Sequence, residues 1–396
     1  SVEKHFPIIM LKTSRFLGVI EWFSKLKGVG VLSSFFLYIL PAVAGFMTYM
    51  LASALVNMLK NFLLRSYVRS LGLEANLLLP GLNPYLPFVY GWVGVVVAIA
   101  VHEGAHGVVA RSKGLPVKSA GLLFFLIVPV GAFVEVDESE MVQAPPSKSM
   151  KVLAAGPGAN LAVAAVALTL LLLLLSTVSP AYGNLLLYAV VENGPAYNAG
   201  VKHGEVILSV NGVNVSSLSE VEKILSSLRV NDILTLTAYV PGNRSIVEHH
   251  IVLGSRPDNV SRAYMGVTIV SLDAVLNNYR RFGLENVLSY LVWPTLSPST
   301  IPFSEHLAPY YVSSAVGSLY PFVANLFYWT WMVNFNLSLF NALPIYPLDG
   351  GQALKIFLKK VSGKRVSERG QNIIVGVISA LMMFLVISTV LVPYIF

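Results

Sequence analysis

Residues Leu86 to Ala110 read LPFVYGWVGVVVAIAVHEGAHGVVA, and this stretch decides what kind of molecule the chain forms. It is as long as the roughly 20 apolar residues that a helix needs to cross the hydrocarbon of a bilayer. Its last third nevertheless contains three ionisable groups, His102, Glu103 and His106. Each such group costs at least about 2.5–3.5 kcal/mol at the bilayer centre, so three in one span indicate a function.

The composition supports a membrane protein. Of 396 residues, 55% are hydrophobic and 12% are charged, whereas roughly 25% are charged in an ordinary soluble domain. The net charge is +7, but the basic residues gather at the ends of apolar runs, which indicates membrane topology and no nucleic-acid partner. The chain has no cysteine, which excludes disulfides and thiolate metal ligands.

The apolar runs predict a multi-pass α-helical membrane protein of about five to six spans, with the lipid bilayer around it. A shorter apolar stretch, 122–134, contains Pro129 and Gly131, so we expect a re-entrant or β-like segment packed against protein. Residues 1–30 mix apolar and basic residues, which is typical of an interfacial segment. The five predicted spans are 31–58, 86–110, 152–178, 320–343 and 371–395.

The basic residues also predict the orientation. Those before the first span, after the second and after the fourth fall on one side, which the positive-inside rule makes cytoplasmic. The long polar segment between the third and fourth spans is then outside the cell membrane. This gives a first membrane part at 31–183, an inserted α/β domain at 184–270, an external or interfacial connector at 271–318 and a second membrane part at 319–396.

The histidines predict a metal site. His102 and His106 are four positions apart, so both imidazoles lie on one helix face and can bind one ion. Glu103 between them can hold a water molecule. Zinc lowers the pKa of such a water towards ~7, and a carboxylate can pass its proton to a leaving amine. An accidental pattern is the alternative, and the apolar surroundings argue against it.

A catalytic zinc site needs a third protein ligand, and Asp349 is the leading candidate. It lies in NALPIYPLDGG (341–351), where the span 320–343 ends. The prolines break regular helix, and the glycines permit a close turn that aims the carboxylate inward. The alternatives are that Asp349 only caps a helix, or that an acid of the run Glu135, Asp137, Glu138 and Glu140 is the ligand; we interpret that run as a solvated loop.

A third motif is GPGAN (156–160), near the cytoplasmic start of the third span. Glycine and proline disturb the helix hydrogen bonds there, and such breaks are tolerated where protein or a cavity satisfies them. Asn160 can donate to a substrate carbonyl or to its oxyanion. The alternative is a kink in which Asn160 bonds only to backbone.

Together, HEGAH (102–106), GPGAN (156–160) and NALPIYPLDGG (341–351) resemble the motifs of the site-2 protease family, zinc metalloproteases that cut transmembrane segments of their substrates. The stretch from His102 to Val134 is more similar to the eukaryotic-type and archaeal members. The resemblance implies His102, His106 and Asp349 as ligands of one Zn²⁺, Glu103 as the catalytic acid/base, and Asn160 as a substrate-positioning or oxyanion group. It implies regulated intramembrane proteolysis of transmembrane protein substrates.

The polar insert resembles a PDZ domain. NGPA (193–196), AGVKHGEVI (199–207) and VNG (210–212) place turn glycines between short apolar strands, and 217–229 has the pattern of a short helix. Tyr264, Met265, Gly266 and Val267 resemble the loop that binds a peptide carboxylate. Their place near the end of the insert implies the permuted strand order of prokaryotic PDZ domains. The alternative is a blocked groove and a purely steric gate.

Other residues receive plainer interpretations. His249 and His250 indicate a surface strand rather than a second metal site. The aromatic stretch 279–311 is typical of a membrane-surface segment or a gate, and Trp329 and Trp331 of packing or an interfacial belt. Two other functions remain open: a membrane zinc protease of another family with a glutamate as third ligand, or a non-enzyme, either a metal transporter or a scaffold that displays its PDZ domain.

Overall fold

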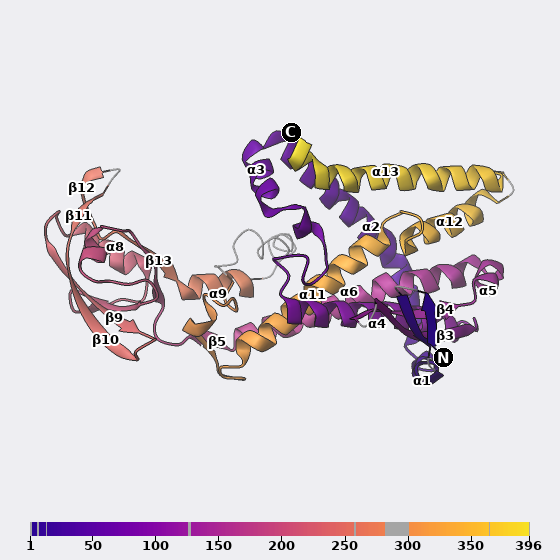
Figure 1. Cartoon of the computed structure of the whole chain (residues 1–396), viewed down its shortest axis with the longest axis horizontal. Coiled ribbons are helices and arrows are strands. Elements are labelled where there is room, and N and C mark those ends of the chain that lie inside the picture. Colours follow the sequence, from indigo (N-terminus) through magenta and orange to yellow (C-terminus); the bar gives the residue numbers. More distant parts are fainter. Residues whose placement is uncertain are drawn as a thin grey trace. The chain divides into compact units, whose positions relative to one another are not determined.

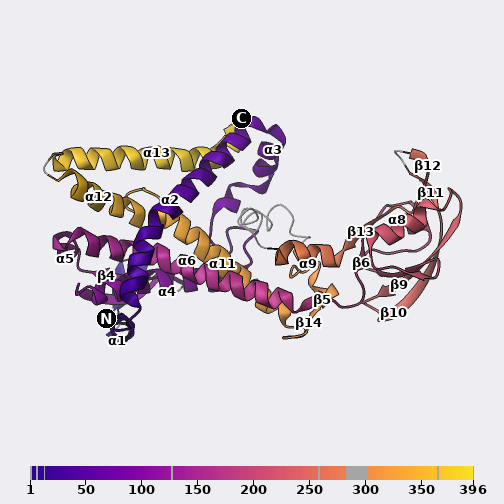
Figure 2. The same ribbon diagram turned by 180° about the vertical axis from the view of Figure 1, so that it is seen from behind.

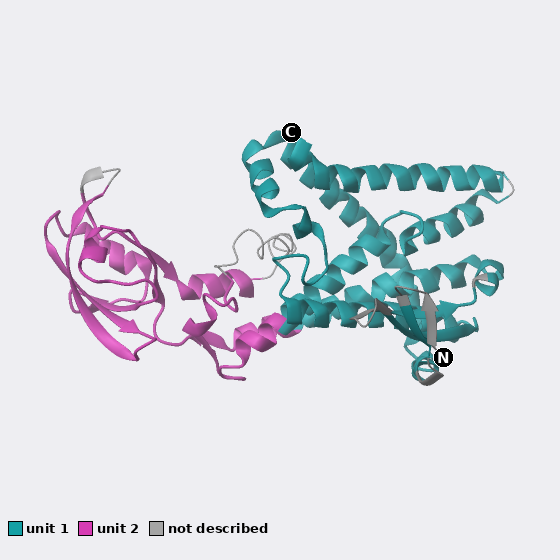
Figure 3. Cartoon of the chain, viewed as in Figure 1, with its two compact units in different colours: residues 1–169, 326–396 teal, residues 170–325 magenta. Residues whose placement is uncertain are grey.

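The computed structural model describes residues 2–5, 8–12, 14–125, 128–256, 259–281, 301–363 and 365–395. The chain divides into two compact units (Figure 3). Unit 1 comprises Ser1–Thr169 and Leu326–Phe396, and unit 2 comprises Leu170–Asn325. Two helices, α6 (Pro146–Ser176) and α11 (Tyr320–Ala342), cross the boundaries between these ranges.

Unit 1 contains helices around a small sheet (Figure 1). Besides parts of α6 and α11, its helices are α1 (Ser14–Ser24), α2 (Val29–Lys60), α3 (Phe62–Leu71), α4 (Phe88–Ser112), α5 (Glu138–Gln143), α12 (Asp349–Ser362), α13 (Glu368–Ile395) and the 3-10 turn η1 (Leu73–Asn76). Its strands are β1 (Val2–His5), β2 (Ile8–Lys12), β3 (Val117–Phe125) and β4 (Val128–Val136).

Four helices are long and apolar enough to cross a membrane, namely α2, α4, α6 and α13. They confirm the helices predicted at 31–58, 86–110, 152–178 and 371–395. The run at 320–343 is also a helix, α11, but it is not one of these four. Its four asparagines, at 325, 334, 336 and 341, make it less apolar than the others. The number of spans therefore stays a prediction.

The core of unit 1 depends on one face of α2. Phe36, Leu40, Val43, Met47 and Leu51 recur every three or four positions and are buried against α6 and α11. Other large apolar side chains of α2, among them Val31, Phe35 and Tyr38, are exposed, as a lipid-facing surface requires. In both views α2 runs across α6 and α11 (Figure 1, Figure 2). The same cluster includes residues of α12, which fixes the start of that helix near α6.

The stretch at 122–134 belongs to an antiparallel hairpin, β3 and β4, so the β-like alternative is correct for the described residues; residues 126–127 lie outside them. The sheet order is β1-β2-β3-β4, which leaves β4 at one edge. The amino-terminal segment, predicted to be interfacial, contributes β1, β2 and α1. Strand β2 pairs with β3 from Ile8–Phe125 to Lys12–Gly121. The interfacial location predicted for the amino-terminal segment stays a prediction.

Unit 2 is rich in strands. Its main sheet has the order β10-β9-β7-β6-β13, with β8 on β7, so β13 is an edge strand. The elements are β5 (Val178–Pro180), β6 (Leu185–Val190), α7 (Pro195–Asn198), β7 (Val206–Val210), β8 (Val213–Asn214), α8 (Leu218–Ser226), β9 (Ile233–Val240), β10 (Ser245–Val252), β11 (Gly254–Arg256), β12 (Asn259–Tyr264), β13 (Val267–Ser271), α9 (Leu272–Arg280), η4 (Ala308–Tyr310) and β14 (Tyr311–Ser313).

The short helix predicted at 217–229 is confirmed as α8. A capping box between Ser217 and Glu220 starts it. Leu185, Leu234, Leu236 and Ile251 are fully buried in the core between the sheet and its helices. The predicted connector 271–318 begins with α9, whose Leu276 and Tyr279 are buried, and it also supplies β14, which pairs with β5. Most of the aromatic stretch 279–311 lies outside the described residues. The predicted limits of the inserted domain (184–270) and of the connector (271–318) stay predictions.

Candidate metal centre

Helix α4 supplies three side chains of the candidate site. His102 and His106 lie on one face, and their ring centroids are 4.8 Å apart with the rings at 80°. Two glycines allow α4 to sit close to its neighbours. A Cβ on Gly94 would lie 2.9 Å from the carbonyl oxygen of Trp329 in α11, and one on Gly107 would lie 2.9 Å from Val134 in β4. The position of the histidines therefore follows from close backbone packing.

The turn between α11 and α12 brings Asp349 to the histidines. Asp349 is the first residue of α12, and Gly350 and Gly351 follow it. A Cβ on Gly350 would lie 2.1 Å from the carbonyl oxygen of Ala342, and one on Gly351 would lie 2.4 Å from Ile345. Only glycine permits a turn this tight, and the turn aims the carboxylate at α4.

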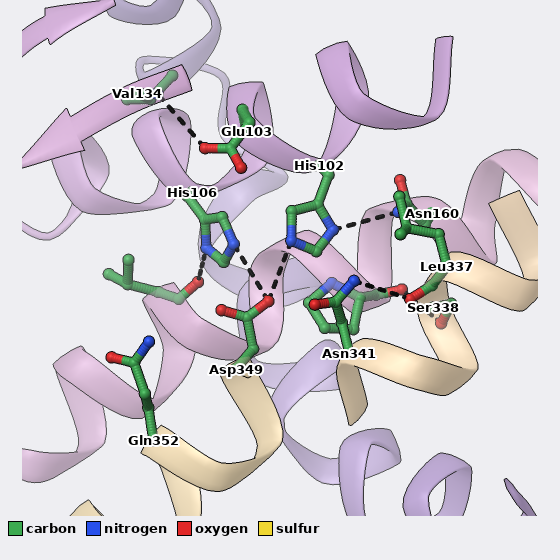
Figure 4. A network of polar contacts seen from close by, with 12 residues as sticks. His102, Glu103, His106, Val134, Asn160, Leu337, Ser338, Asn341, Asp349 and Gln352 are labelled. Atoms are coloured by element: carbon green, nitrogen blue, oxygen red, sulfur yellow. Dashed lines mark hydrogen bonds and ion pairs between the residues drawn. The ribbon is translucent and has the colours of Figure 1, made fainter. Parts of the chain in front are cut away.

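Three ligand atoms meet at one point (Figure 4). His102 Nε2 is 3.0 Å from Asp349 Oδ2, and His106 Nε2 is 3.4 Å from the same oxygen. One candidate ligand atom from each of the three residues lies within 4.8 Å of the others. Zinc bonds of 2.0–2.2 Å place tetrahedral ligands about 3.3 Å apart, so the spacing fits a metal ion. The structure thus brings together the three residues predicted as ligands.

Two further observations fit a metal between these atoms. Asp349 is 9% exposed, and its Oδ2 is buried without a hydrogen-bond partner of proper geometry among the described residues. An unsatisfied buried carboxylate oxygen is costly unless a cation completes it. In addition, a Cβ on Gly156 of α6 would lie 2.5 Å from His106 Nε2 and 2.7 Å from His102 Nε2. Glycine keeps this space open.

Each imidazole also has a partner at its other nitrogen. His106 Nδ1 is 2.7 Å from the carbonyl oxygen of Val152, so Nδ1 donates and Nε2 presents a lone pair to the site. His102 Nδ1 is 3.2 Å from Asn160 Nδ2. Both partners come from α6, one turn on either side of Gly156, which explains why this segment of α6 lies against the histidines.

Glu103 points to the opposite side of the histidines, towards β4 (Figure 4). The backbone N–H of Val134 donates to its Oε2 at 3.3 Å. This N–H points away from β3 and lies on the free edge of β4. A cavity of about 830 Å³ borders the same strand and is lined by Val134, Glu135, Val136, Lys118 of β3, Asp137 and residues of α5. The carboxylate is therefore close to both the candidate metal site and a strand edge.

Two residues of the acidic run, Glu135 and Asp137, are engaged elsewhere. Glu135 accepts from Ser119 at 2.6 Å and lies 3.9 Å from Lys12. Asp137 caps α5 and pairs with Lys118 at 2.9 Å. The hydrogen bonds from Ser139 and Lys118 hold the pKa of Asp137 well below its usual range. Neither residue belongs to the group around His102.

The other singled-out residues lie apart from this group. Trp329 and Trp331 are buried in α11, as packing requires. In unit 2, His249 bonds to Glu205 and His250 lies on an exposed strand face. Tyr264 ends β12, Val267 begins β13, and Gly266 between them has a φ of +81°.

The sequence identifies Gly156 only as a helix breaker and gives no sign of a role for Val152 or Val134. A glycine one turn from two ligands is the signal that could have shown a space kept free. Val152 and Val134 act through backbone atoms, which their residue type does not reveal.

Comparisons with known proteins give a consistent result. The chain is 26% identical over 289 residues to "Uncharacterized protein MJ0971" of Methanocaldococcus jannaschii, covering 72% of this chain and 62% of that protein. It is 27% identical to "Zinc metalloprotease RasP" of Bacillus licheniformis, covering 60% of this chain and 57% of that one. It is also 27% identical to "Regulator of sigma-W protease RasP" of Bacillus subtilis, covering 60% of this chain and 57% of that protein. The chain thus spans about three fifths of the length of these curated relatives.

The profile of peptidase family M50 matches residues 90–385, which include both helices that carry the histidines and Asp349. This is well over half of the chain, and the zinc metalloproteases among the relatives agree with a single Zn²⁺ as cofactor at a His-His-Asp group. The chain therefore belongs to peptidase family M50, the site-2 protease family of membrane metallopeptidases.

Proposed function

We propose that this protein is an intramembrane zinc metalloprotease that hydrolyses peptide bonds in or near transmembrane segments of membrane-protein substrates. The observation that carries the proposal is the convergence of His102, His106 and Asp349, with Glu103 on the same helix. Helix α4 is one of the four candidate spans, so the chemistry takes place at membrane depth. Family membership supports the reaction class.

His102, His106 and Asp349 are the proposed ligands, and one further position is left for water. Bound zinc supplies the Lewis acidity that activates water and polarises a peptide carbonyl. The ligands hold this site in a defined shape, because each imidazole is fixed from α6 and the carboxylate is fixed by the glycine turn.

Glu103 is the proposed acid/base. Its carboxylate accepts the proton of the attacking water and then donates it to the amide nitrogen that leaves. The N–H of Val134 is its one hydrogen-bond donor in the part of the chain that the structure describes. This contact holds the carboxylate between the ligand group and the strand edge, where a scissile bond would have to lie.

The edge of β4 is the proposed binding surface for substrate. A transmembrane helix must unwind before its carbonyl groups become accessible, and an unwound segment can add to an open edge as a strand. Strand β4 is the last of its sheet, and its free edge faces Glu103. The bordering cavity of about 830 Å³ gives room for side chains of an extended peptide.

For unit 2 we propose a permuted PDZ-like domain that binds a peptide carboxyl terminus at Tyr264–Val267. The support is an edge strand, β13, that follows this loop directly, together with a short helix, α8, on the same domain. The carbonyls of Met265 and Gly266 accept from Ala196 and Val191, so the loop is held in place by backbone bonds. A domain that binds no peptide and screens substrates by size is the other outcome of a binding test.

We further propose that the chain lies in the cell membrane with its active site near the cytoplasmic side and its PDZ-like domain outside. The distribution of basic residues supports this orientation. Reaction of single introduced cysteines with a membrane-impermeant reagent tests it, and the absence of natural cysteine makes the readout clean. Labelling at Ser226 only in opened cells would contradict the proposed location of unit 2.

Glu103→Gln is the decisive variant for the proposed reaction. Wild type and variant are purified in detergent, their zinc content is measured, and both are assayed on a transmembrane peptide. We expect bound zinc in both and cleavage slower by about 10²–10⁴-fold in the variant, the typical cost of removing a general base. Glu222→Gln on the exposed face of α8 is the matched control.

Equal cleavage by wild type and Glu103→Gln would contradict the role of Glu103. Zinc binding without cleavage of any of several transmembrane peptides by wild type would favour the scaffold. An essential glutamate in place of Asp349 would indicate a zinc protease of another type.

A further inference from the structure

The residue that carries a further inference is Asn160 of α6. Its side chain is fully buried, with 0% exposure. Its Nδ2 lies 3.2 Å from His102 Nδ1, while its Oδ1 is buried with no hydrogen-bond partner in the described part of the chain. The amide therefore faces the back of the imidazole (Figure 4). A buried amide on the far side of a ligand is poorly placed to contact a substrate.

The donor and acceptor pattern at His102 is incompatible with metal binding in this amide orientation. An Nδ2–H group that donates to Nδ1 requires a lone pair on Nδ1, and a neutral imidazole then carries its hydrogen on Nε2. His102 Nε2 is the atom that faces Asp349 Oδ2 at 3.0 Å. A metal ligand must present a lone pair at Nε2, so the hydrogen of the neutral His102 ring has to be on Nδ1.

A half-turn of the carboxamide resolves this conflict. The oxygen and the NH₂ group have nearly the same size, so both orientations fit the same space. After the turn, Oδ1 accepts from Nδ1–H and Nε2 is free. In the orientation drawn, Oδ1 has no hydrogen-bond partner among the described residues. The state of His102 decides the orientation.

We infer that Asn160 is a positioning residue for His102, with its carboxamide oriented so that Oδ1 accepts from His102 Nδ1–H. Asparagine suits this task because its two ends are an acceptor and a donor. It can therefore bond to either tautomer of the ring, whereas the backbone carbonyl of Val152 at His106 can bond to only one. The inference rests on the proposed metal site and assigns Asn160 no contact with substrate.

Three variants test the inference through zinc affinity, measured by competition with a chelator on the purified full chain. Asn160→Leu removes the acceptor and should weaken zinc binding 10- to 100-fold, the usual cost of losing such a partner. Asn160→Asp keeps an acceptor of the same shape and should stay within about threefold of wild type. Ser338→Ala is the matched control, because Ser338 is also fully buried and bonds to α6 at Pro157 without touching a histidine.

A second readout follows His102 directly. Solid-state ¹⁵N spectra of histidine-labelled protein distinguish a protonated Nδ1 from a protonated Nε2. We expect a hydrogen-bonded Nδ1–H signal of His102 in the zinc form of wild type, and in zinc-loaded Asn160→Leu the same signal shifted towards that of an N–H group without an acceptor. Asn160→Asp should keep the hydrogen-bonded Nδ1–H signal, because its carboxylate is an acceptor.

The inference is overturned if Asn160→Leu binds zinc like wild type but cleaves slowly, which would indicate an oxyanion or substrate role. It is also overturned if Ser338→Ala weakens zinc binding as much as Asn160→Leu does, since the effect would then come from general packing. A third contrary outcome is a zinc affinity of Asn160→Asp as low as that of Asn160→Leu. Failure of wild type to bind zinc would instead defeat the proposed function.

Discussion

Among the described residues, each unit contains a largely buried group of histidine and carboxylate side chains, and the two groups differ in their hydrogen bonding. In unit 2, His249 Nε2 is 2.9 Å from Glu205 Oε2 and its Nδ1 is 3.2 Å from the carbonyl oxygen of Ala199. Glu205 Oε1 accepts from the backbone N–H of Lys202 at 3.2 Å. Every ring nitrogen and every carboxylate oxygen of this pair has its own partner.

In unit 1, by contrast, two imidazoles share one oxygen, Asp349 Oδ2, which lacks a properly directed hydrogen bond. Both groups are largely buried and place imidazole nitrogens against a carboxylate. In unit 2 each polar atom of the pair has a partner, whereas in unit 1 Asp349 Oδ2 has none of proper geometry among the described residues and would be satisfied by a cation. Hydrogen bonding alone therefore distinguishes the stabilising contact of His249 with Glu205 from the candidate metal site around Asp349, without reference to any sequence motif.

The largest expected effect is that of Asp349→Asn. The variant replaces a charged ligand by a neutral amide, and the protein should lose bound zinc and at least about 10⁴-fold in cleavage rate, equivalent to about 5.5 kcal/mol. Zinc content by mass spectrometry and cleavage of a transmembrane peptide measure both. Asp137→Asn, in the acidic run, is the control and should keep its zinc. If only Asp137→Asn lost its zinc, the third ligand would be in the acidic run and Asp349 would not be a ligand.

The next effect concerns unit 2. His249→Leu leaves Glu205 buried without its partner, which should destabilise the domain by about 3–5 kcal/mol. Hydrogen exchange of the amides of β7 and β10 in the full chain measures this, and zinc content should not change. His250→Leu is the control, because its side chain is 65% exposed and its contact with Glu248 is 3.8 Å long, so about 0–1 kcal/mol is expected. Similar hydrogen exchange in both variants would contradict a stabilising role of the contact between His249 and Glu205.

The smallest expected effect comes from Gly156→Ala. The added methyl group would lie within 2.7 Å of both imidazoles, and we expect zinc binding to weaken about a hundredfold, equivalent to about 2.7 kcal/mol. Gly45→Ala in α2, where no atom lies within 4 Å, should leave zinc affinity unchanged and alter helix stability by about 1 kcal/mol at most. Unchanged zinc binding by Gly156→Ala would show that the space beside the histidines is not needed.

Much of the fold was predictable because hydropathy over 20 or more residues dominates local preferences. The helices at α2, α4, α6 and α13 begin and end within a few residues of the predicted runs, apart from the earlier start of α6. The pairing of β2 with β3 joins residues more than 100 positions apart, and the five residues IIMLK carry no pattern that selects this partner. Such contacts depend on tertiary packing.

The candidate site shows the same limit. The spacing of His102 and His106 and the glycine turn after Asp349 are local patterns, so the sequence sufficed to group these residues. Asn160 was predicted to face substrate, and that role is untested; the structure finds it buried behind His102. The direction of a side chain depends on the rotation of its helix against its neighbours, which the sequence of one segment does not determine.

Gly156 has a consequence for the genetics of this protein. Any single-base change in a glycine codon either is silent, ends the chain or introduces a residue with a Cβ. Every missense mutation at this codon therefore puts at least one carbon atom beside both imidazole Nε2 atoms. A random mutational screen for inactive protein should accordingly recover this position, which bears no functional group, alongside the codons of the ligands themselves.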